Sequence, residues 1–260
     1  MSTRHCTLEL VESEESRSRR GSPRVERPRA AAPALNVSPW SRSVLKRIFD
    51  CTCVLLAFPL LIPVFIAVAL AVRVTSRGPI LFRQQRTGKL GQSFTILKFR
   101  TMRHVKGTAH CAIATTGDQS FTPIGRFLRC WKLDELPQVL NVLCGHMSLV
   151  GPRPKMFEHA TYLLPCRPGI TGAATIAFAR EEAALSRVPK DCLHELYHGA
   201  VLPAKQHLDN EYMMRATFVS DIRLVVDTIL RRWDSSYLDS VIAEAVPRGV
   251  PALKSTSESA

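Results

Sequence analysis

The chain has 260 residues, with 35 Lys and Arg against 22 Asp and Glu, a formal net charge of +13 and a pI near 9.8. This length allows one or two domains, and the positive charge predicts an anionic partner: nucleic acid, an acidic membrane surface or a phosphorylated substrate. Its eight cysteines show no zinc-ligand spacing, and no helix-turn-helix, RNA-binding or aromatic-interleaved basic pattern is found. We therefore expect reduced thiols and no nucleic-acid partner.

Residues 1–43 are rich in Ser, Pro, Ala, Arg and Glu and poor in large apolar side chains. Such a segment cannot bury enough apolar surface to offset the entropy lost on ordering, so we predict a disordered basic tail. Its arginines either contact anionic lipid or are simply solvated. No apolar segment typical of a signal peptide precedes residue 44, so we expect the folded part of the chain to stay on the cytoplasmic side.

The strongest feature of the composition is an uncharged apolar run over residues 53–72. As an α-helix rising about 1.5 Å per residue, it could cross a hydrocarbon layer of about 30 Å, although a buried helix of a soluble protein is the alternative. Pro59 and Pro63 interrupt this run, and basic residues flank both of its ends. Because Lys and Arg favour the cytoplasmic side, we predict that residues 44–75 form a re-entrant helical hairpin, bent near Pro63.

Residues 76–235 show the mixed pattern of one small folded domain. Apolar or β-branched stretches at 80–82 and 94–99, separated by glycine-containing turns, predict strands. A short helix is predicted over 122–131, capped by a threonine and opened by a proline. A second helix is predicted over 134–144 and ends at a glycine.

The C-terminal part contains an amphipathic helix over residues 218–233, where apolar residues recur at helical spacing with arginines among them. Two placements remain open for its apolar face. It packs against the domain core, or it lies in the membrane interface with the arginines towards the headgroups. The remaining residues, 236–260, are predicted to form a flexible tail.

Two adjacent carboxylates, Asp134 and Glu135, open the second predicted helix. A helix N-terminus offers unpaired N–H groups and the positive end of a dipole, which stabilise a carboxylate and attract phosphate. The two side chains would point about 100° apart, so we expect them to divide the roles of nucleophile and metal ligand. A structural helix cap is the alternative. Basic residues surround the pair in sequence, and Arg153 stands out because prolines on both sides would fix its position.

The motifs beyond residue 45 resemble those of the bacterial sugar transferases, also called monotopic phosphoglycosyl transferases. The resemblance covers most of the chain and is specific because many motifs occur in one order. They are residues 46–50, 78–88, 98–102, 133–138, 141–143, 147–154 and 167–172, followed by Asp221.

The resemblance implies an α+β, helix-rich monotopic membrane protein with a re-entrant N-terminal hairpin, a small catalytic domain and amphipathic interfacial helices. It implies transfer of a sugar 1-phosphate from a UDP-sugar to polyprenyl (undecaprenyl) phosphate, through a covalent aspartyl-phosphosugar intermediate and with release of UMP. The reaction would begin surface or exopolysaccharide synthesis at the cytoplasmic face of the bacterial inner membrane. A catalytically altered membrane scaffold of a polysaccharide assembly complex is the alternative.

Residue by residue, the resemblance implies a nucleophile, Asp134, a Mg²⁺ ligand, Glu135, and phosphate-binding cations, Lys98, Arg129 and Arg153. Mg²⁺ prefers oxygen ligands and substrate phosphates, so a single carboxylate suits it. The expected partners are the UDP-sugar, the polyprenyl phosphate and the lipid bilayer. The sequence leaves open the identity of the sugar, the prenyl length and whether the protein forms a homodimer.

The sequence departs from the family pattern in three places. His146 stands where an acidic residue is usual, and Ile62 stands where a serine usually precedes the proline of the bend. Without the serine, one way of satisfying a freed backbone group is lost, so the bend is expected to depend on Pro59 as well as Pro63. The segment 173–182 also differs from the commoner type, which we interpret as a subgroup variant that bears on the sugar accepted.

Overall fold

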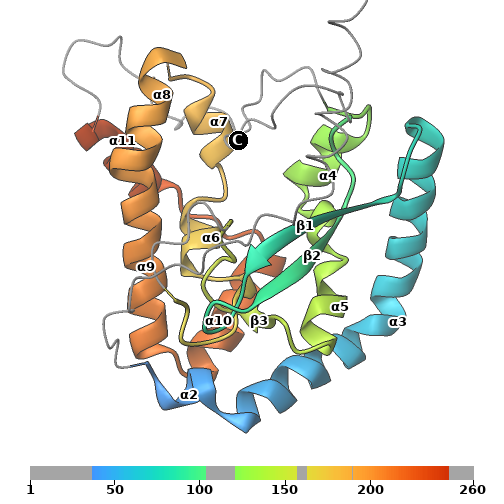
Figure 1. Cartoon of the computed structure of the whole chain (residues 1–260), viewed down its shortest axis with the longest axis horizontal. Coiled ribbons are helices and arrows are strands. Elements are labelled where there is room, and N and C mark those ends of the chain that lie inside the picture. Colours follow the sequence, from blue (N-terminus) through green and yellow to red (C-terminus); the bar gives the residue numbers. More distant parts are fainter. Residues whose placement is uncertain (1–36, 104–120, 157–162, 189, 246–260) are drawn as a thin grey trace, which may run out of the picture.

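The structure is a computed structural model, and it describes residues 37–103, 121–156, 163–188 and 190–245. It is a mixed fold of helices around two small sheets (Figure 1). The strands are β1 (Leu81–Thr87), β2 (Ser93–Phe99), β3 (Ser148–Val150) and β4 (Gly169–Thr171). The helices are α2 (Pro39–Arg42), α3 (Val44–Thr75), α4 (Gly125–Cys130), α5 (Gln138–Leu143), α6 (Ala173–Ala177), α7 (Glu181–Leu185), α8 (Lys190–Leu196), α9 (Leu202–Arg215), α10 (Phe218–Ile229) and α11 (Ser236–Ala245), with a 3-10 turn η1 (Leu133–Glu135) and a π-helical turn η3 (Tyr197–Val201).

Helix α3 is a single helix of 32 residues that contains both Pro59 and Pro63. Its first part runs beneath the rest of the fold, and it then changes direction and rises along one side (Figure 1). Large apolar side chains on α3 face outward, among them Leu56 (77% exposed) and Leu60 (73% exposed). The helix is long and apolar enough to enter a membrane, and its exposed apolar surface favours this over a buried helix of a soluble protein.

The two predicted strands form an antiparallel hairpin of β1 and β2, which pair from Leu81 with Phe99 to Thr87 with Ser93. The prediction of strands here is confirmed, although β1 extends beyond the predicted 80–82. A parallel pair, β3 and β4, forms the second sheet. Both sheets are small, so the helices supply most of the packing.

The predicted helix over 122–131 begins later than expected, as α4 at Gly125. The Thr122 hydroxyl donates to the carbonyl of Thr101 (3.2 Å) and does not cap the helix. The predicted cap was therefore wrong. A side chain at Gly125 would collide with the same Thr101 carbonyl, so the close approach of these segments requires a glycine.

The predicted helix over 134–144 is divided into η1 and α5. Pro137 lies between them and has no backbone N–H with which to continue the helical hydrogen bonding. Asp134 and Glu135 therefore lie in η1 and not in the first turn of α5, which corrects the predicted position at a helix N-terminus. Gly145, in the left-handed region at φ 82°, follows the end of α5 as predicted.

Two predicted tail segments contain ordered helix. Residues 39–42 of the predicted N-terminal tail form α2, and residues 236–245 of the predicted C-terminal tail form α11. Leu238 and Ile242 of α11 are buried in an apolar core with residues of α7, α8, α9 and η3. Burial of these side chains offsets the ordering entropy that the tail prediction assumed would dominate. Residues 1–36 and 246–260 of the two predicted tails lie outside the described residues.

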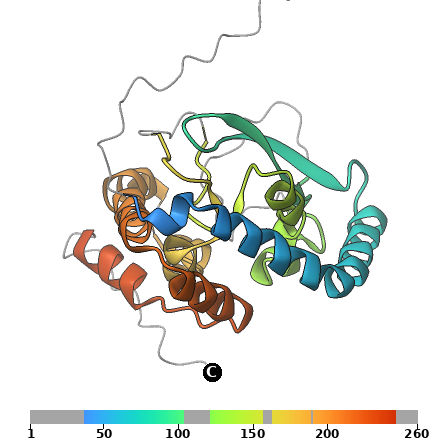
Figure 2. The same cartoon turned by 90° about the horizontal axis from the view of Figure 1, so that it is seen from below.

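The amphipathic helix is also shorter than predicted, because α10 ends at Ile229 and Arg231 takes a left-handed conformation (φ 53°). Figure 2 shows α2 and the first part of α3 (blue) crossing the lower face of the fold with α10 nearby. The Phe218 ring of α10 lies 5.5 Å from the Trp40 ring and 5.2 Å from the Phe49 ring. These aromatic contacts join α10 to α2 and α3.

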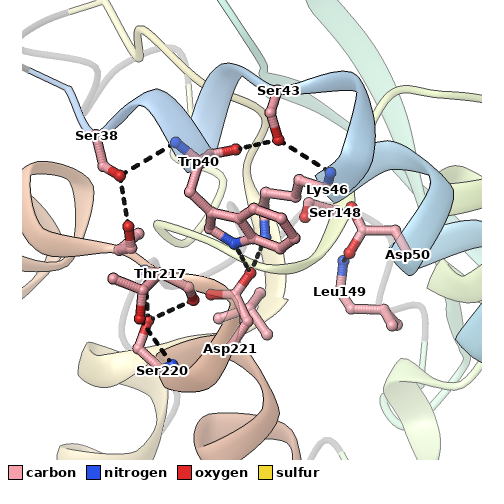
Figure 3. A network of polar contacts seen from close by, with 12 residues as sticks. Ser38, Trp40, Ser43, Lys46, Asp50, Ser148, Leu149, Thr217, Ser220 and Asp221 are labelled. Carbon is pink, nitrogen blue, oxygen red and sulfur yellow. Dashed lines mark hydrogen bonds and ion pairs between the residues drawn. The ribbon is translucent and has the colours of Figure 1, made fainter.

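A buried polar network fixes these helices to one another (Figure 3). The Asp221 carboxylate of α10 accepts hydrogen bonds from Trp40 Nε1 (2.8 Å) and the Tyr212 hydroxyl (2.7 Å), and it forms an ion pair with Lys46. Because Asp221 is fully buried, each of these partners reduces the cost of keeping its charge away from water.

Asp50 forms a second buried junction, one α-helical turn further along α3. Its carboxylate accepts hydrogen bonds from the Ser148 hydroxyl (2.6 Å) and from the backbone N–H of Leu149 (3.2 Å) (Figure 3). Both partners belong to β3. The two junctions therefore attach the first turns of α3 to the folded domain. Further along α3, Val68 and Val72 are buried in an apolar core with Phe99 and Leu128, while other apolar side chains of the helix stay exposed.

Candidate active site

A large cleft of about 1660 Å³ contains all the predicted catalytic and phosphate-binding residues. Lys98 comes from β2, Arg129 from α4, Asp134 and Glu135 from η1, and Arg153 from the segment after β3. The fold thus brings together five side chains that lie up to 55 residues apart in sequence (98 to 153). The predicted bend residues, Pro59 and Pro63, lie in the interior of α3.

Glu135 is the most strongly paired carboxylate of this cleft. Its Oε1 atom lies 2.8 Å from Lys98 Nζ and 2.7 Å from a guanidinium nitrogen of Arg153. Burial on its own would raise the pKa of Glu135, but Arg153, Lys98 and Lys132 outweigh it and hold this pKa well below its usual range. Glu135 is therefore ionised at neutral pH.

Asp134 is also buried, but its environment differs from that of Glu135. In the described part of the chain its carboxylate has no ion-pair partner within 4 Å. Burial is the main reason why the pKa of Asp134 is raised, and the negative charge of Glu135 adds to this increase. Lys98, Arg129 and Lys132 oppose this increase from a greater distance. A carboxylate that is held near cations without being paired to one keeps its oxygens available for attack on phosphorus.

Backbone hydrogen bonds hold the segment around Arg153 in place. The carbonyl of Pro152 accepts a hydrogen bond from Gly169 N–H (2.9 Å), and the backbone N–H of Arg153 donates to Asp209. Sequence reasoning missed Asp209, a buried carboxylate of α9 that lines the cleft, because an acidic residue on a helix carries no local signal of burial. Burial raises the pKa of Asp209 to about 7, although Lys155 opposes this increase.

Arg129 lines the cleft but does not contact the Asp134–Glu135 pair. Its guanidinium lies 3.1 Å from Glu182 and 5.4 Å from the centre of the Phe121 ring. Glu182 belongs to the segment 173–182 that departs from the family pattern, and sequence reasoning did not assign it a contact with Arg129.

Lys132 is a further cation of the site whose importance the sequence understated. It takes a left-handed conformation (φ 56°) immediately before η1. Burial lowers its pKa, and Arg153 adds to this effect, while the two carboxylates of η1 act in the opposite direction. Lys132 therefore contributes positive charge at the base of the carboxylate pair.

His146, the departure at a usual acidic position, lies outside this cleft. Its ring is exposed and stacks on Phe94, with 5.9 Å between the ring centres. The substitution therefore leaves the residues around Asp134 and Glu135 untouched, and His146 is a surface histidine.

The cleft that holds the buried Asp134–Glu135 pair and several cations lies beside a helix long and apolar enough to enter a membrane. This combination is that of a membrane-associated protein with a candidate site for an anionic ligand. The family model for the bacterial sugar transferases matches residues 41–234, so this chain belongs to the bacterial sugar transferase family. The matched region includes α3 and every cleft residue discussed above.

Curated relatives carry names that agree with this family. A UDP-glucose:undecaprenyl-phosphate glucose-1-phosphate transferase of Caulobacter vibrioides is 44% identical over 141 residues, covering 50% of this chain and 53% of that protein. An N-acetylgalactosaminephosphotransferase of Aeromonas hydrophila, which is named for the same acceptor, is 36% identical over 51% of this chain and 34% of its own length. The exopolysaccharide production protein PSS of Rhizobium leguminosarum bv. phaseoli is 35% identical over 72% of this chain and 94% of its own length. The chain spans about half or less of the length of the other two relatives.

Proposed function

We propose that this protein is a phosphoglycosyl transferase, which moves a sugar 1-phosphate from a UDP-sugar to undecaprenyl phosphate and so begins the synthesis of a surface or exported polysaccharide. The observation that carries this proposal is the buried pair of Asp134 and Glu135 among the cations of one cleft. The names of the relatives support the acceptor and the class of reaction. The intact carboxylate pair argues against the alternative of a non-catalytic scaffold.

In the first step, an Asp134 oxygen attacks the β-phosphorus of the UDP-sugar. The bond between this phosphorus and the bridging oxygen breaks, UMP leaves, and an aspartyl-phosphosugar remains. In the second step, a phosphate oxygen of undecaprenyl phosphate attacks the same phosphorus and releases the Asp134 carboxylate. Lys98, Arg153 and Lys132 stabilise the negative charge on the transferring oxygens.

Glu135 suits a Mg²⁺ site better than Asp134 does. Both of its cation contacts are made by Oε1, so Oε2 is the oxygen that would bind a metal together with substrate phosphates. The described residues contain no cluster of three or more His, Cys, Asp or Glu side chains that could hold a metal, which agrees with a site completed by the substrate. Bound Mg²⁺ would neutralise charge on the diphosphate.

Removal of divalent cations with EDTA is expected to abolish UMP release, and Mg²⁺ is expected to restore it. Glu135→Gln keeps the size of the side chain but removes its charge, so this variant should need at least about tenfold more Mg²⁺ for half-maximal rate, because one charged ligand is lost. The measurement is a Mg²⁺ titration of UMP release. An unchanged Mg²⁺ dependence in Glu135→Gln would remove Glu135 from the metal site.

The membrane arrangement follows from the exposed apolar surfaces. We propose that α3 enters the cytoplasmic leaflet of the inner membrane and returns to the same side, with a bend that Pro59 and Pro63 support. Apolar residues of α10 also face outward, including Val219 and Ile229, each 72% exposed. With this face in the membrane interface, the cleft would open close to the lipid acceptor.

An epitope tag before Met1 tests the re-entrant course. In intact spheroplasts treated with protease, this tag and a tag after Ala260 should both be protected, because both would be cytoplasmic. Permeabilised spheroplasts, in which both tags should be cleaved, serve as the control. Cleavage of only the N-terminal tag in intact spheroplasts would show that α3 spans the membrane.

The reaction itself is tested with detergent-purified protein, Mg²⁺, undecaprenyl phosphate and a panel of UDP-sugars. Multiple-turnover UMP release that requires the acceptor supports the transferase proposal and identifies the sugar. Folded protein that releases no UMP with any member of a broad panel would instead support the scaffold alternative.

A further inference from the structure

One wall of the cleft carries charged and aromatic side chains that the phosphate chemistry does not use. Glu181 at the start of α7 forms an ion pair with Lys205 of α9, and the two side chains are about one-fifth exposed. The Lys205 ammonium lies 5.3 Å from the centre of the Phe178 ring and 5.4 Å from that of the Tyr197 ring. All four residues line the cleft. We call this group the α7–α9 pocket.

The backbone around Tyr197 is unusual. Tyr197 opens η3, a π-helical turn between α8 and α9, and such turns occur often at functional sites. The Tyr197 hydroxyl is close enough to Glu181 and Arg153 for both charges to affect its pKa. The charge of Glu181 acts on Arg153 as well, so the pocket adjoins the phosphate-binding cations.

The pocket lies on the side of the cleft away from the membrane helix. Phe65 and Ala69 of α3 line the cleft at its other side. Figure 1 shows α7, α8 and α9 on the side of the fold opposite the rising part of α3. An acceptor with a prenyl chain would approach along α3, because its tail remains in the lipid.

The two proposed steps restrict where the sugar can lie. In each step the attacking and leaving oxygens are roughly in line, so undecaprenyl phosphate must approach from the direction in which UMP has left. The sugar stays attached to the transferred phosphorus during both steps, and it therefore needs a place that neither UMP nor the acceptor uses. The α7–α9 pocket offers such a place.

We propose that the α7–α9 pocket holds the sugar ring of the donor, with Glu181 accepting hydrogen bonds from its hydroxyl groups and Tyr197 packing against its apolar face. This inference rests on the proposed function and deepens it. Lys205 orients Glu181 and offers a donor to a sugar oxygen. A carboxylate that accepts hydrogen bonds from hydroxyl groups suits a neutral hexose or N-acetylhexosamine, which carries such groups.

Glu181→Gln tests the pocket in binding and in turnover. We expect the wild type to bind its preferred UDP-sugar at least about tenfold more tightly than UDP, since a site built to hydrogen-bond a substrate discriminates against the analogue without those groups. Glu181→Gln should lose most of this difference while its affinity for UDP stays the same. It should also change the ratio of kcat/KM values between UDP-glucose and UDP-galactose or their N-acetyl forms. Isothermal titration calorimetry in an Asp134→Asn background, which cannot form the proposed covalent intermediate, gives the binding readout. UMP release by protein with Asp134 intact gives the turnover readout.

Glu195→Gln is the matched control, because Glu195 is exposed on α8 and does not line the cleft. Lys205→Met gives a second test if Glu181→Gln folds poorly, and it should also lose the preference for UDP-sugar over UDP. Equal weakening of UDP and all UDP-sugars would mean that the pocket holds uridine, and unchanged affinities and ratios would mean that it holds neither group. Either result would overturn the inference. Sugar-dependent binding without UMP release would contradict the proposed function and leave the pocket assignment standing.

Discussion

Asp134→Asn is expected to reduce multiple-turnover UMP release by about 10³-fold or more, because it removes the proposed nucleophile and keeps the shape of the side chain. The substitution also removes a buried charge next to Glu135, so the fold should be as stable as the wild type or slightly more stable. The measurements are UMP release under saturating UDP-sugar, acceptor and Mg²⁺, and thermal unfolding in detergent.

Asp239→Asn is the matched control for this variant, because Asp239 is exposed on α11 and lies outside the cleft. It should keep the wild-type rate. If Asp134→Asn turned over at a rate near that of the wild type, Asp134 would have no part in the chemistry. Loss of activity together with loss of folding would instead point to a structural role.

Lys46→Met is expected to destabilise the folded protein by about 3–5 kcal/mol, because it leaves the charge of Asp221 buried without its ion-pair partner. The side chains of Lys46 and Asp221 are only 6% and 0% exposed. Trp40 and Tyr212 would still donate hydrogen bonds to Asp221, which places the expected effect towards the lower end of this range. Chemical unfolding in detergent measures the change.

Arg215→Met provides the comparison, because the ion pair of Arg215 with Glu211 is exposed (79% and 44%) and should contribute less than about 1 kcal/mol. Adding Asp221→Asn to Lys46→Met should recover part of the lost stability, since the unpaired charge is removed. Equal effects of Lys46→Met and Arg215→Met would show that the network in Figure 3 does not hold α3 to the domain.

The elements that the sequence predicted well are those with a strong local signal. The apolar run of α3 and the apolar or β-branched stretches of β1 and β2 are such signals, and the structure has these elements close to the predicted positions. The errors lie where a distant contact decides the local structure. Thr122 bonds the Thr101 carbonyl and does not cap α4, and the helix α11 depends on burying Leu238 and Ile242 against other helices.

For the candidate site too, the residues with a local sequence signal were predicted and those that depend on distant contacts were not. The motifs supplied Asp134, Glu135, Lys98 and Arg153, and the structure brings these four residues into one cleft. The partners that set the pKa values and positions of these residues were not predicted. Asp209, for example, lies 56 positions after Arg153 (153 to 209) and meets its backbone only through the packing of α9.

The proposed membrane attachment and the proposed chemistry depend on the same helix. The first turns of α3 are fixed by Asp221 and by the junction at Asp50, and further along α3 Phe65 lines the cleft. The acceptor phosphate must reach Asp134 while its prenyl tail stays in lipid. Rigid attachment of α3 would therefore set the distance between the bilayer and the nucleophile.

The central claim is that the sugar phosphate is carried on Asp134 between two displacements. The most direct test incubates the purified protein with Mg²⁺ and a UDP-sugar labelled in the sugar, in the absence of acceptor. We expect close to one UMP to be released per chain, a protein mass increase of one sugar phosphate that is absent in Asp134→Asn, and transfer of the label to lipid when undecaprenyl phosphate is added. Release of UMP only in the presence of acceptor, with no labelled protein at any time, would show a single direct displacement and contradict the account.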